Sequence, residues 1–458
     1  MFSKSNLGTN IVLFFVIPSV CCSIMLLDDI NSKYTLISAV LLVVFFSAYF
    51  LNEYLKQNDY LMLLVISATT LYAMTVLPGW TILNKNSVIV VALCYFIWFI
   101  SKFNFSFLVK KMKNFSFWNA VFVLQVLSLV LSILVFNLKD FFQLIGFAKI
   151  IVLTGSAVFF GLYIPSKINQ NPELMQFIVK GLVYSGLFAS IGGLITIISN
   201  VNPYSSIPNS AISFFAHVNL PTFLYMFSVP AALYSIFFRK NDTTVYFRFL
   251  LFVSVILMIL NVFFTYNRAG IIAISVGIGV LTLFYSRKIL IGMAILVVPM
   301  LSVITTIFLT KGTATVLSRL SLYLVAFEMM QSSLIGFLFG FGIETNYLIF
   351  HKIKIANSVI DMHDYPHNSY IFFILQFGVI PLALTLLSFL ILLYKVFSLI
   401  LKKKGDNQIY LSLSIVLSVA IYALFEDFFL FPENFMYHFV WLFLGILYVK
   451  IKSNNTDQ

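Results

Sequence analysis

Two apolar segments on either side of a single arginine decide the fold. Residues 247–265 read FRFLLFVSVILMILNVFFT, residues 266–268 read YNR, and residues 269–286 read AGIIAISVGIGVLTLFYS. A helix needs roughly 20 apolar residues to cross a bilayer. The sequence therefore predicts two spanning helices joined by a short polar turn at Arg268.

The same pattern extends over the whole chain. Of its 458 residues, 61% are hydrophobic and only 10% are charged, whereas soluble domains carry about 25% charged residues. A soluble protein of this size could not bury so much apolar surface, which excludes a cytosolic enzyme, a nucleic-acid-binding module and a disordered scaffold. We expect one all-α polytopic membrane domain, residues 1–458, with about 12–14 transmembrane helices. The candidate spans are 10–27, 34–51, 60–77, 86–101, 118–136, 141–163, 176–198, 212–238, 247–265, 269–286, 289–309, 368–396, 408–425 and 435–450.

The net charge of +12 is explained by topology. Basic residues concentrate in the cytoplasmic loops of membrane proteins. With a cytoplasmic N-terminus, every strong basic cluster falls inside, and the C-terminus is cytoplasmic too. These clusters include Lys110–Lys113, Arg239–Lys240, Arg287–Lys288, Lys402–Lys404 and Lys450–Lys452.

One long loop, residues 310–366, falls outside and breaks the pattern of short connections. Within it, residues 316–331 are predicted to form a helix, because Leu320, Tyr323, Leu324 and Phe327 share one apolar face. Such a helix suits the membrane interface. The following Leu338–Gly342 stretch is predicted to be a turn.

Arg268 and Arg319 are the two arginines that lie on the outer side, against the charge bias. Each could be an interfacial residue whose charge reaches the headgroups. Alternatively, the guanidinium fork could grip a phosphate in a bidentate manner, which lysine cannot do.

The histidines also map to the outer side, and His363 and His367 stand close together, with Asp364 between them. A metal site is one interpretation, but Pro366 argues against one helix presenting both rings. We favour a neutral imidazole that takes a proton or binds a phosphate oxygen, and expect no metal and no cofactor. The chain has no nucleotide-binding motif, so its substrate must arrive already activated.

Four motifs, in this order, resemble the bacterial O-antigen polymerase and O-antigen ligase superfamily. They are TYNRAG at 265–270, LSRLSLY at 317–323, FGFG at 339–342 and PHNSYIFFILQFGVIPL at 366–382. The segment SFFAHVNL at 213–220 is similar to an earlier motif of that family. Asn267 stands where the family commonly has Ser, and Pro381 where it commonly has a second Gly.

The resemblance implies a metal-independent glycosyltransferase of the GT-C type in the bacterial inner membrane, with a periplasmic active site. Donor and acceptor would be glycans on undecaprenyl pyrophosphate, and chain-length regulator and flippase proteins would be possible partners. His367, Arg268 and Arg319 would be catalytic, with Glu344, Asp364, Glu426 or Asp427 as alternative bases. The implied substrate-binding residues are His217, Asn219, Tyr266, Tyr323, Glu344, His363, Asp364, Asn368, Glu426 and Asp427.

Three functions are compatible with these motifs. A polymerase, which we favour, would join lipid-linked repeat units, whereas a ligase would transfer the glycan to lipid A–core. A flippase or other transporter is the third, although transporters often show repeats and ionisable residues in mid-membrane. Lys149 and Lys180 are the only such candidates here.

Overall fold

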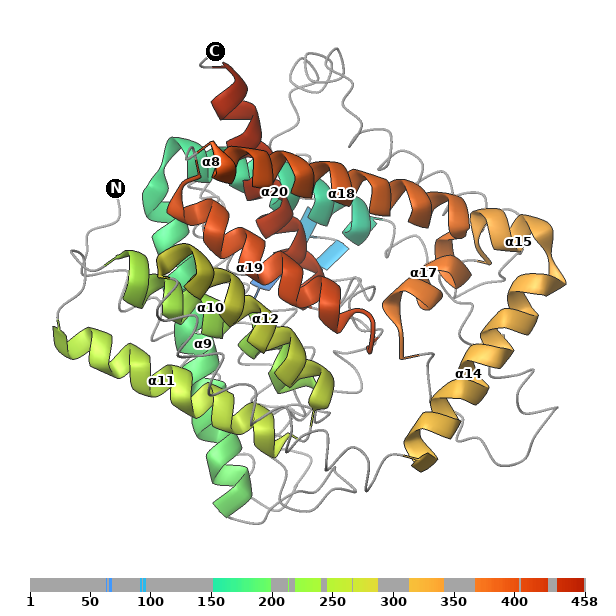
Figure 1. Cartoon of the computed structure of the whole chain (residues 1–458), viewed down its shortest axis with the longest axis horizontal. Helices are drawn as coiled ribbons and strands as arrows, with labels where there is room; N and C mark the ends of the chain where they lie inside the picture. The colour runs from blue at the N-terminus through green and yellow to red at the C-terminus, as the bar shows by residue number, and fades with distance from the viewer. Residues whose placement is uncertain are drawn as a thin grey trace.

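The computed structural model describes residues 151–198, 219–239, 245–265, 267–286, 313–341, 367–402, 405–426 and 435–456. It also describes eight single residues: Leu63, Ile66, Ser67, Val91, Ala92, Cys94, Tyr95 and Ser213. Within this part of the chain every regular element is a helix (Figure 1). The prediction of an all-α membrane protein is therefore confirmed.

Six of the described helices are long and apolar enough to cross a membrane. The first, Ile151–Gln170, contains a π-helical turn, η1 (Phe159–Tyr163), and continues as α8 (Ile164–Gln170). The others are α9 (Pro172–Ile198), α10 (Leu220–Phe238), α11 (Val245–Phe264), α12 (Arg268–Tyr285) and α18 (Val379–Leu401). The remaining helices are α14 (Thr313–Ser332), α15 (Leu334–Phe339), α17 (Ser369–Phe377), α19 (Asn407–Tyr422) and α20 (Phe435–Thr456).

Four expected spans, 176–198, 247–265, 269–286 and 408–425, match a helix to within about four residues. The expected 141–163 span, whose first ten residues are outside the described part, continues to Gln170, and the expected 435–450 span continues to Thr456. The expected 212–238 span begins later, at Leu220, where Pro221 occupies the first turn. The expected 368–396 span is wrong as a single helix, because the chain breaks between α17 and α18 at Gly378, whose φ is +92°. The expected spans at 10–27, 34–51, 118–136 and 289–309 lie outside the described residues, as do nearly all of those at 60–77 and 86–101.

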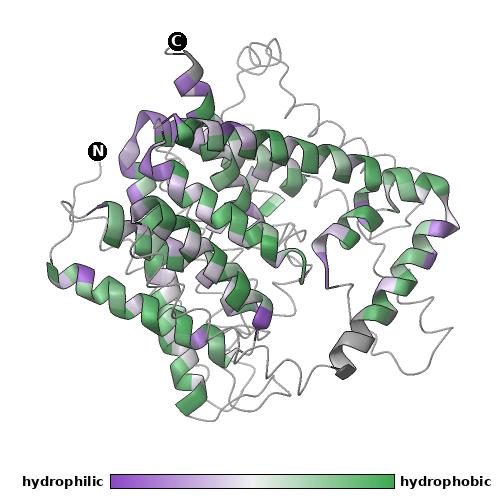
Figure 2. Cartoon of the chain, in the orientation of Figure 1, coloured by the Kyte–Doolittle hydropathy of each residue, from purple (hydrophilic) through white to green (hydrophobic). Residues whose placement is uncertain are grey.

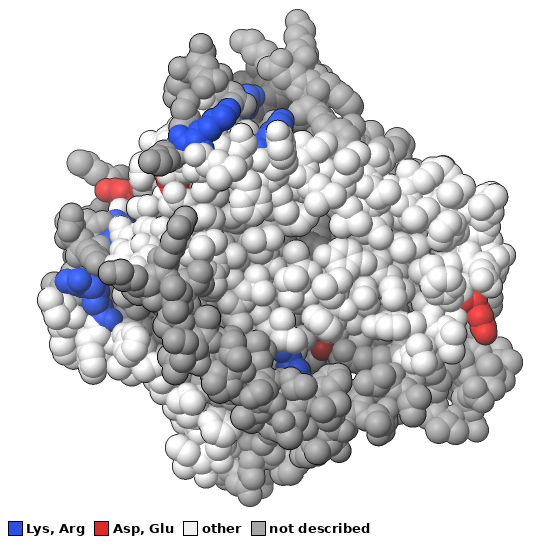
Figure 3. All heavy atoms as spheres, viewed as in Figure 1, with Lys and Arg blue, Asp and Glu red and all other residues white. Residues whose placement is uncertain are grey.

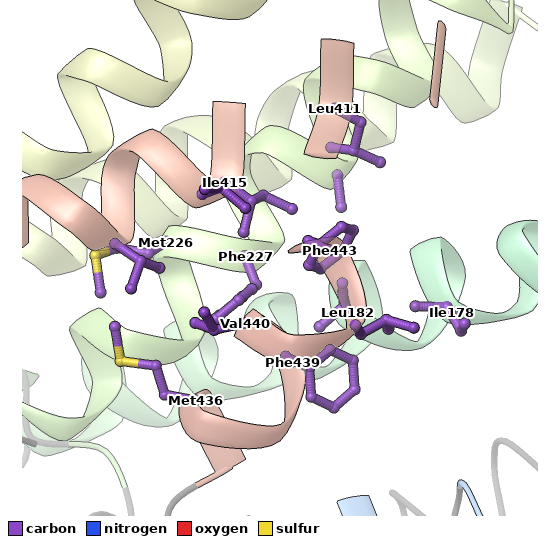
Figure 4. Close-up of a cluster of buried hydrophobic side chains, with 14 of the residues drawn as sticks. Ile178, Leu182, Met226, Phe227, Leu411, Ile415, Met436, Phe439, Val440 and Phe443 are labelled. Carbon is purple, nitrogen blue, oxygen red and sulfur yellow. The ribbon is translucent and has the colours of Figure 1, made fainter. Parts of the chain in front are cut away.

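Helix α10 forms the centre of the bundle. It is apolar on all sides, as expected for a helix that is fully surrounded, and residues 220–235 are all buried. Met226 and Phe227 of α10 meet side chains of three other helices (Figure 4). These side chains are Ile178 and Leu182 of α9, Leu411 and Ile415 of α19, and Met436, Phe439, Val440 and Phe443 of α20.

Small residues allow α12 and α19 to approach each other closely. A Cβ added at Gly277 would collide with the hydroxyl of Ser418. The Ser414 hydroxyl donates a hydrogen bond to the Gly277 carbonyl at 2.8 Å. Small residues and interhelical hydrogen bonds are typical of helix packing in membranes, where lipid removes the hydrophobic driving force.

The outer surface of the bundle is apolar, as Figure 2 shows for α11 and α18. Tyr246 and Phe249 of α11 are 72% and 63% exposed, and Leu390 of α18 is 60% exposed. Exposed apolar surface of this extent marks a membrane-contacting face.

Basic residues gather at one end of the bundle, called here the basic end. The Lys450 ammonium of α20 lies 2.6 Å from the Asp406 carboxylate, which caps α19. Tyr410 at the start of α19 stacks on Phe284 of α12, with ring centroids 4.6 Å apart. In Figure 3 most Lys and Arg side chains of the described residues lie at the upper left. Of the basic clusters named above, Lys110–Lys113 and Arg287–Lys288 lie outside the described residues, and the topology stays a prediction.

Candidate active site

Helix ends meet opposite the basic end, and polar side chains join them. The Asn267 amide donates to the Tyr422 hydroxyl at 2.8 Å, which ties the start of α12 to the last residue of α19. Tyr422 also lies edge-on to Phe223, in the first turn of α10, with ring centroids 5.2 Å apart. The Thr222 and Thr265 hydroxyls, 3.4 Å apart, join α10 to the end of α11. This opposite end therefore brings together the first turns of α10 and α12 and the last turns of α11 and α19.

The start of α17 is held against the end of α19. The Ser369 hydroxyl donates to the Glu426 carbonyl at 2.6 Å, and the Ser369 amide donates to the Ala423 carbonyl at 2.8 Å. The Asn368 side chain accepts from the Tyr370 and Ile371 amides, as helix-capping residues do, and donates to the Leu424 carbonyl at 2.9 Å. The Asn368 side chain therefore holds the start of α17 in place, and its role in substrate binding stays a prediction.

His367 directly precedes this cap and is paired with a buried carboxylate. Its Nδ1 lies 3.3 Å from Oε2 of Glu426, and the two side chains are 25% and 4% exposed. The backbone of His367 adopts a left-handed conformation, with φ of +46°, which is uncommon for a residue other than glycine. Backbone strain of this kind concentrates at functional sites, where the surrounding structure maintains it. The His367 imidazole is thus held in place from both the backbone and the side chain.

The pairing of His367 with Glu426 brings together two of the residues that the sequence analysis singled out. Glu426 is buried at the end of α19, and its carboxylate faces the imidazole. A carboxylate that holds one ring nitrogen of a histidine fixes the orientation of the ring. The geometry favours His367 as the reacting group and Glu426 as the residue that orients it.

Arg268 is the first residue of α12 and is half-buried. Its neighbour Asn267 caps the helix by accepting from the Gly270 amide at 2.9 Å. The N-terminus of a helix carries a partial positive charge, so an arginine there adds to an electropositive site. That combination favours an anion, because backbone amides and the guanidinium act together.

Arg319 lies in α14, a helix that covers the predicted 316–331 stretch. The side chain of Arg319 is outside the described residues, but its place in the helix follows from the register. Leu322, Ala326 and Met330 of α14 are buried against α17, and Arg319 stands three, seven and eleven residues before them in the same helix. Tyr323 follows Arg319 by one turn and is half-buried.

The expected apolar face of α14 faces outward. Leu320, Leu324 and Phe327 are 51%, 59% and 62% exposed. The helix is therefore apolar on two sides, one packed on protein and the other open. Both sides of α14 fit the helical period, so hydrophobic spacing alone could not show which side packs on protein.

The other sequence candidates divide between described and undescribed residues. Asn219 immediately precedes α10 at the opposite end and is half-buried. The remaining candidates, His217, Tyr266, Glu344, His363, Asp364 and Asp427, lie outside the described residues. Among the described residues, no group of three or more His, Cys, Asp or Glu side chains could hold a metal ion.

Sequence reasoning missed Tyr422 and Ser369. Tyr422 links α10, α12 and α19, and Ser369 anchors α17 beneath His367. A hydroxyl within an apolar segment is the one sequence signal that could have indicated them, because a buried hydroxyl needs a hydrogen-bond partner. That signal is weak here, since serine and tyrosine are frequent in the predicted spans.

A second polar cluster lies elsewhere in the bundle. Nδ1 of the fully buried His438 in α20 lies 2.6 Å from the Ser156 hydroxyl and 2.8 Å from the Tyr95 hydroxyl. These contacts tie α20 to the Ile151–Gln170 helix and to a residue of the expected 86–101 span. Packing and hydrogen bonding of this kind stabilise helix association within a membrane.

The fold and site define a polytopic α-helical membrane protein that gathers an arginine and a histidine–carboxylate pair at one end of its bundle. Residues 253–386 match the sequence model of the O-antigen ligase family. The matched segment runs from α11 to the first turns of α18 and supports the resemblance to the O-antigen polymerase and ligase superfamily. A comparison with curated proteins found no match.

Proposed function

We propose that the protein is a glycosyltransferase that polymerises a bacterial surface polysaccharide from repeat units carried on undecaprenyl pyrophosphate. The pairing of His367 with Glu426, together with Arg268 at the start of α12, supports this proposal most directly. The match of residues 253–386 to the O-antigen ligase family supports an activity of this general kind. We infer that the substrate is a membrane lipid because the site lies at the end of a bundle of membrane-spanning helices.

In this reaction an acceptor hydroxyl attacks the anomeric carbon of the donor glycan. A carbon–oxygen bond forms there while the bond to the pyrophosphate oxygen breaks, and undecaprenyl pyrophosphate leaves with the electron pair. Nε2 of His367 takes the hydroxyl proton, and the Glu426 carboxylate stabilises the imidazolium that results. The carboxylate also fixes the orientation of the ring.

The departing pyrophosphate carries the charge that develops in the transition state. Arg268 and Arg319 would bind it through their guanidinium forks. Donors that are already oriented toward developing charge can supply a large part of the rate enhancement. No metal is needed in this scheme, because the two arginines and the start of α12 provide the positive charge.

The orientation of the protein follows from the basic end. We infer that this end faces the cytoplasm, as the positive-inside rule requires, which puts the site in the periplasm. In a variant lacking the native cysteines, an impermeant thiol reagent should label Leu424→Cys from outside and leave Leu401→Cys unlabelled. Those positions are 44% and 83% exposed at opposite ends of the bundle. The reverse labelling would overturn a periplasmic site.

A ligase is the second candidate, because the family description names that activity. Both reactions use the same donor and leaving group and differ in the acceptor. In a deletion strain, loss of a polymerase should leave lipopolysaccharide whose core carries a single repeat unit. Loss of a ligase should leave core with no repeat unit, so the banding pattern decides between them.

A further inference from the structure

Two short helices that lie far apart in the sequence end in the same way. Helix α15 ends at Gly340, with φ of +89°, and α17 ends at Gly378, with φ of +92°. In each case the glycine amide donates to the carbonyl four residues earlier, that of Gly336 or Ile374, at 2.8 Å. Both positions need a left-handed backbone, which glycine adopts without a steric penalty.

The two helix ends also lie directly against each other. A Cβ added at Gly340 would collide with the backbone of Gln376 and Phe377. A Cβ added at Gly378 would collide with the backbone of Leu338 and Phe339. The junction is closed by the Phe341 amide, which donates to the Leu375 carbonyl at 2.8 Å. Backbone atoms cannot move aside as a side chain can. Glycine is therefore required at each position for two reasons: its left-handed conformation and its lack of a Cβ.

This glycine junction connects the helices that carry two of the proposed reacting groups. Helix α15 follows α14 after a single residue, Ser333, and α14 carries Arg319. Helix α17 begins two residues after His367. Figure 1 shows α14 and α17 on the same side of the bundle, with α15 joining the top of α14 to the α17–α18 corner.

Side-chain packing extends the connection below the junction. Leu322, Ala326 and Met330 of α14 form one buried cluster with Leu375 of α17 and with Phe341. The Phe341 ring packs against Gly336, where an added Cβ would collide with it. The placement of α14 relative to α17 is therefore determined by the junction and the cluster together.

We propose that Gly340 and Gly378 are positioning residues that set Arg319 in register with His367 for glycan transfer. This inference rests on the proposed function, in which Arg319 binds the pyrophosphate and His367 takes the proton. A displacement of about 1 Å at a reacting group can cost about 100-fold in rate. A side chain at either glycine must push the two backbones apart and displace α14 by a comparable distance.

The first test measures this displacement without reference to activity. Spin labels at Leu324 of α14 and Leu424, after α19, are both well exposed and report the distance between α14 and the bundle. Gly340→Ala and Gly378→Ala should shift or broaden that distance distribution. The label pair Phe252 and Leu424 should not change, because Phe252 lies on α11. Gly279→Ala is the matched control, since a Cβ there meets nothing within 4 Å.

The second test is a double-mutant cycle on transfer activity. Gly340→Ala should lower kcat at least 10-fold, and it should add little to the loss caused by Arg319→Ala, because both remove the same contact. The effects of Gly340→Ala and Arg268→Ala should multiply, since α12 does not pass through the junction. General destabilisation would instead multiply with both arginine variants. If Gly340→Ala fails to accumulate, Gly336→Ala provides a milder displacement through the Phe341 ring.

The outcomes separate this inference from the proposed function. An unchanged Leu324–Leu424 distance in the glycine variants, or a Gly340→Ala effect that multiplies with that of Arg319→Ala, would overturn the positioning role. Wild-type activity in Arg319→Ala itself would overturn the proposed function of that arginine, whatever the label distances show.

Discussion

The Nδ1 atom of His367 lies 3.3 Å from Oε2 of Glu426, although 59 residues separate the two in the sequence. The contact joins the start of α17 to the end of α19. A histidine oriented by a buried carboxylate is an arrangement that enzymes use to accept a proton from an attacking hydroxyl. The first three predictions concern this pair.

Replacement of His367 should remove polymerisation. We expect His367→Ala to lose about 100- to 10,000-fold in rate, the range typical of general acid–base catalysis. His363→Ala, four residues earlier in the chain, should retain most activity and is the control. Polymer length on isolated lipid-linked glycan, with protein level measured in parallel, provides the assay.

His367→Gln separates two roles of the same residue. Gln can donate a hydrogen bond to a phosphate but cannot accept a proton as a base. We expect activity as low as in His367→Ala. Substantial activity would exclude general-base catalysis by His367 and transfer that role to one of the carboxylates.

Glu426→Gln should lower the rate by about 10- to 1000-fold, because a neutral amide no longer stabilises the imidazolium. The protein should still accumulate, since Ser369 bonds the backbone carbonyl of residue 426 and not its side chain. Glu328→Gln, on the exposed side of α14, is the matched control. Unchanged turnover in Glu426→Gln would contradict an orienting role.

Arg268→Ala should cost about 30- to 1000-fold in rate, as expected for loss of a charge-assisted contact to the leaving group. Arg268→Lys should restore only part of the activity, because a point charge lacks the guanidinium fork. Arg239→Ala, at the basic end, should be close to wild type. Full rescue by lysine would show that the fork is not used.

Asn267 tests the structure independently of the chemistry. Its side chain caps α12 and donates to the Tyr422 hydroxyl. Asn267→Ala should destabilise the protein by about 2 kcal/mol, since it loses a helix cap and a buried hydrogen bond. Asn267→Ser, the residue common in the resembling family, should retain the cap and most of the activity. Thermal unfolding in detergent measures the stability of both variants. Equal stability of the wild type, Asn267→Ala and Asn267→Ser would be inconsistent with the contacts described.

The bundle was largely predictable from sequence because hydrophobic length and charge asymmetry fix spanning helices. The break at Gly378 was not, since an apolar run of 29 residues at 368–396 gives no hydropathy signal for a left-handed glycine. The outward face of α14 was recognised, but its packed face was not, because both are apolar.

The candidate site was predictable in its residue types and less so in its geometry. Arg268, His367 and Glu426 were identified from the side of the membrane on which they fall. The pairing of His367 with Glu426 requires the start of α17 to meet the residues that follow α19, which no local pattern encodes. The capping role of Asn368 was not predicted: its side chain accepts from the Tyr370 amide and donates to the Leu424 carbonyl.

We propose above all that this protein joins glycans and that the bond between the donor glycan and its lipid pyrophosphate breaks in the process. The most direct measurement supplies purified protein in liposomes with a single lipid-linked repeat unit, with no lipid A–core and with a metal chelator present. The account predicts a ladder of longer lipid-linked chains, with one undecaprenyl pyrophosphate released per linkage, and no ladder with His367→Ala. Products that form only after lipid A–core is added, or a ladder that persists in His367→Ala, would contradict it.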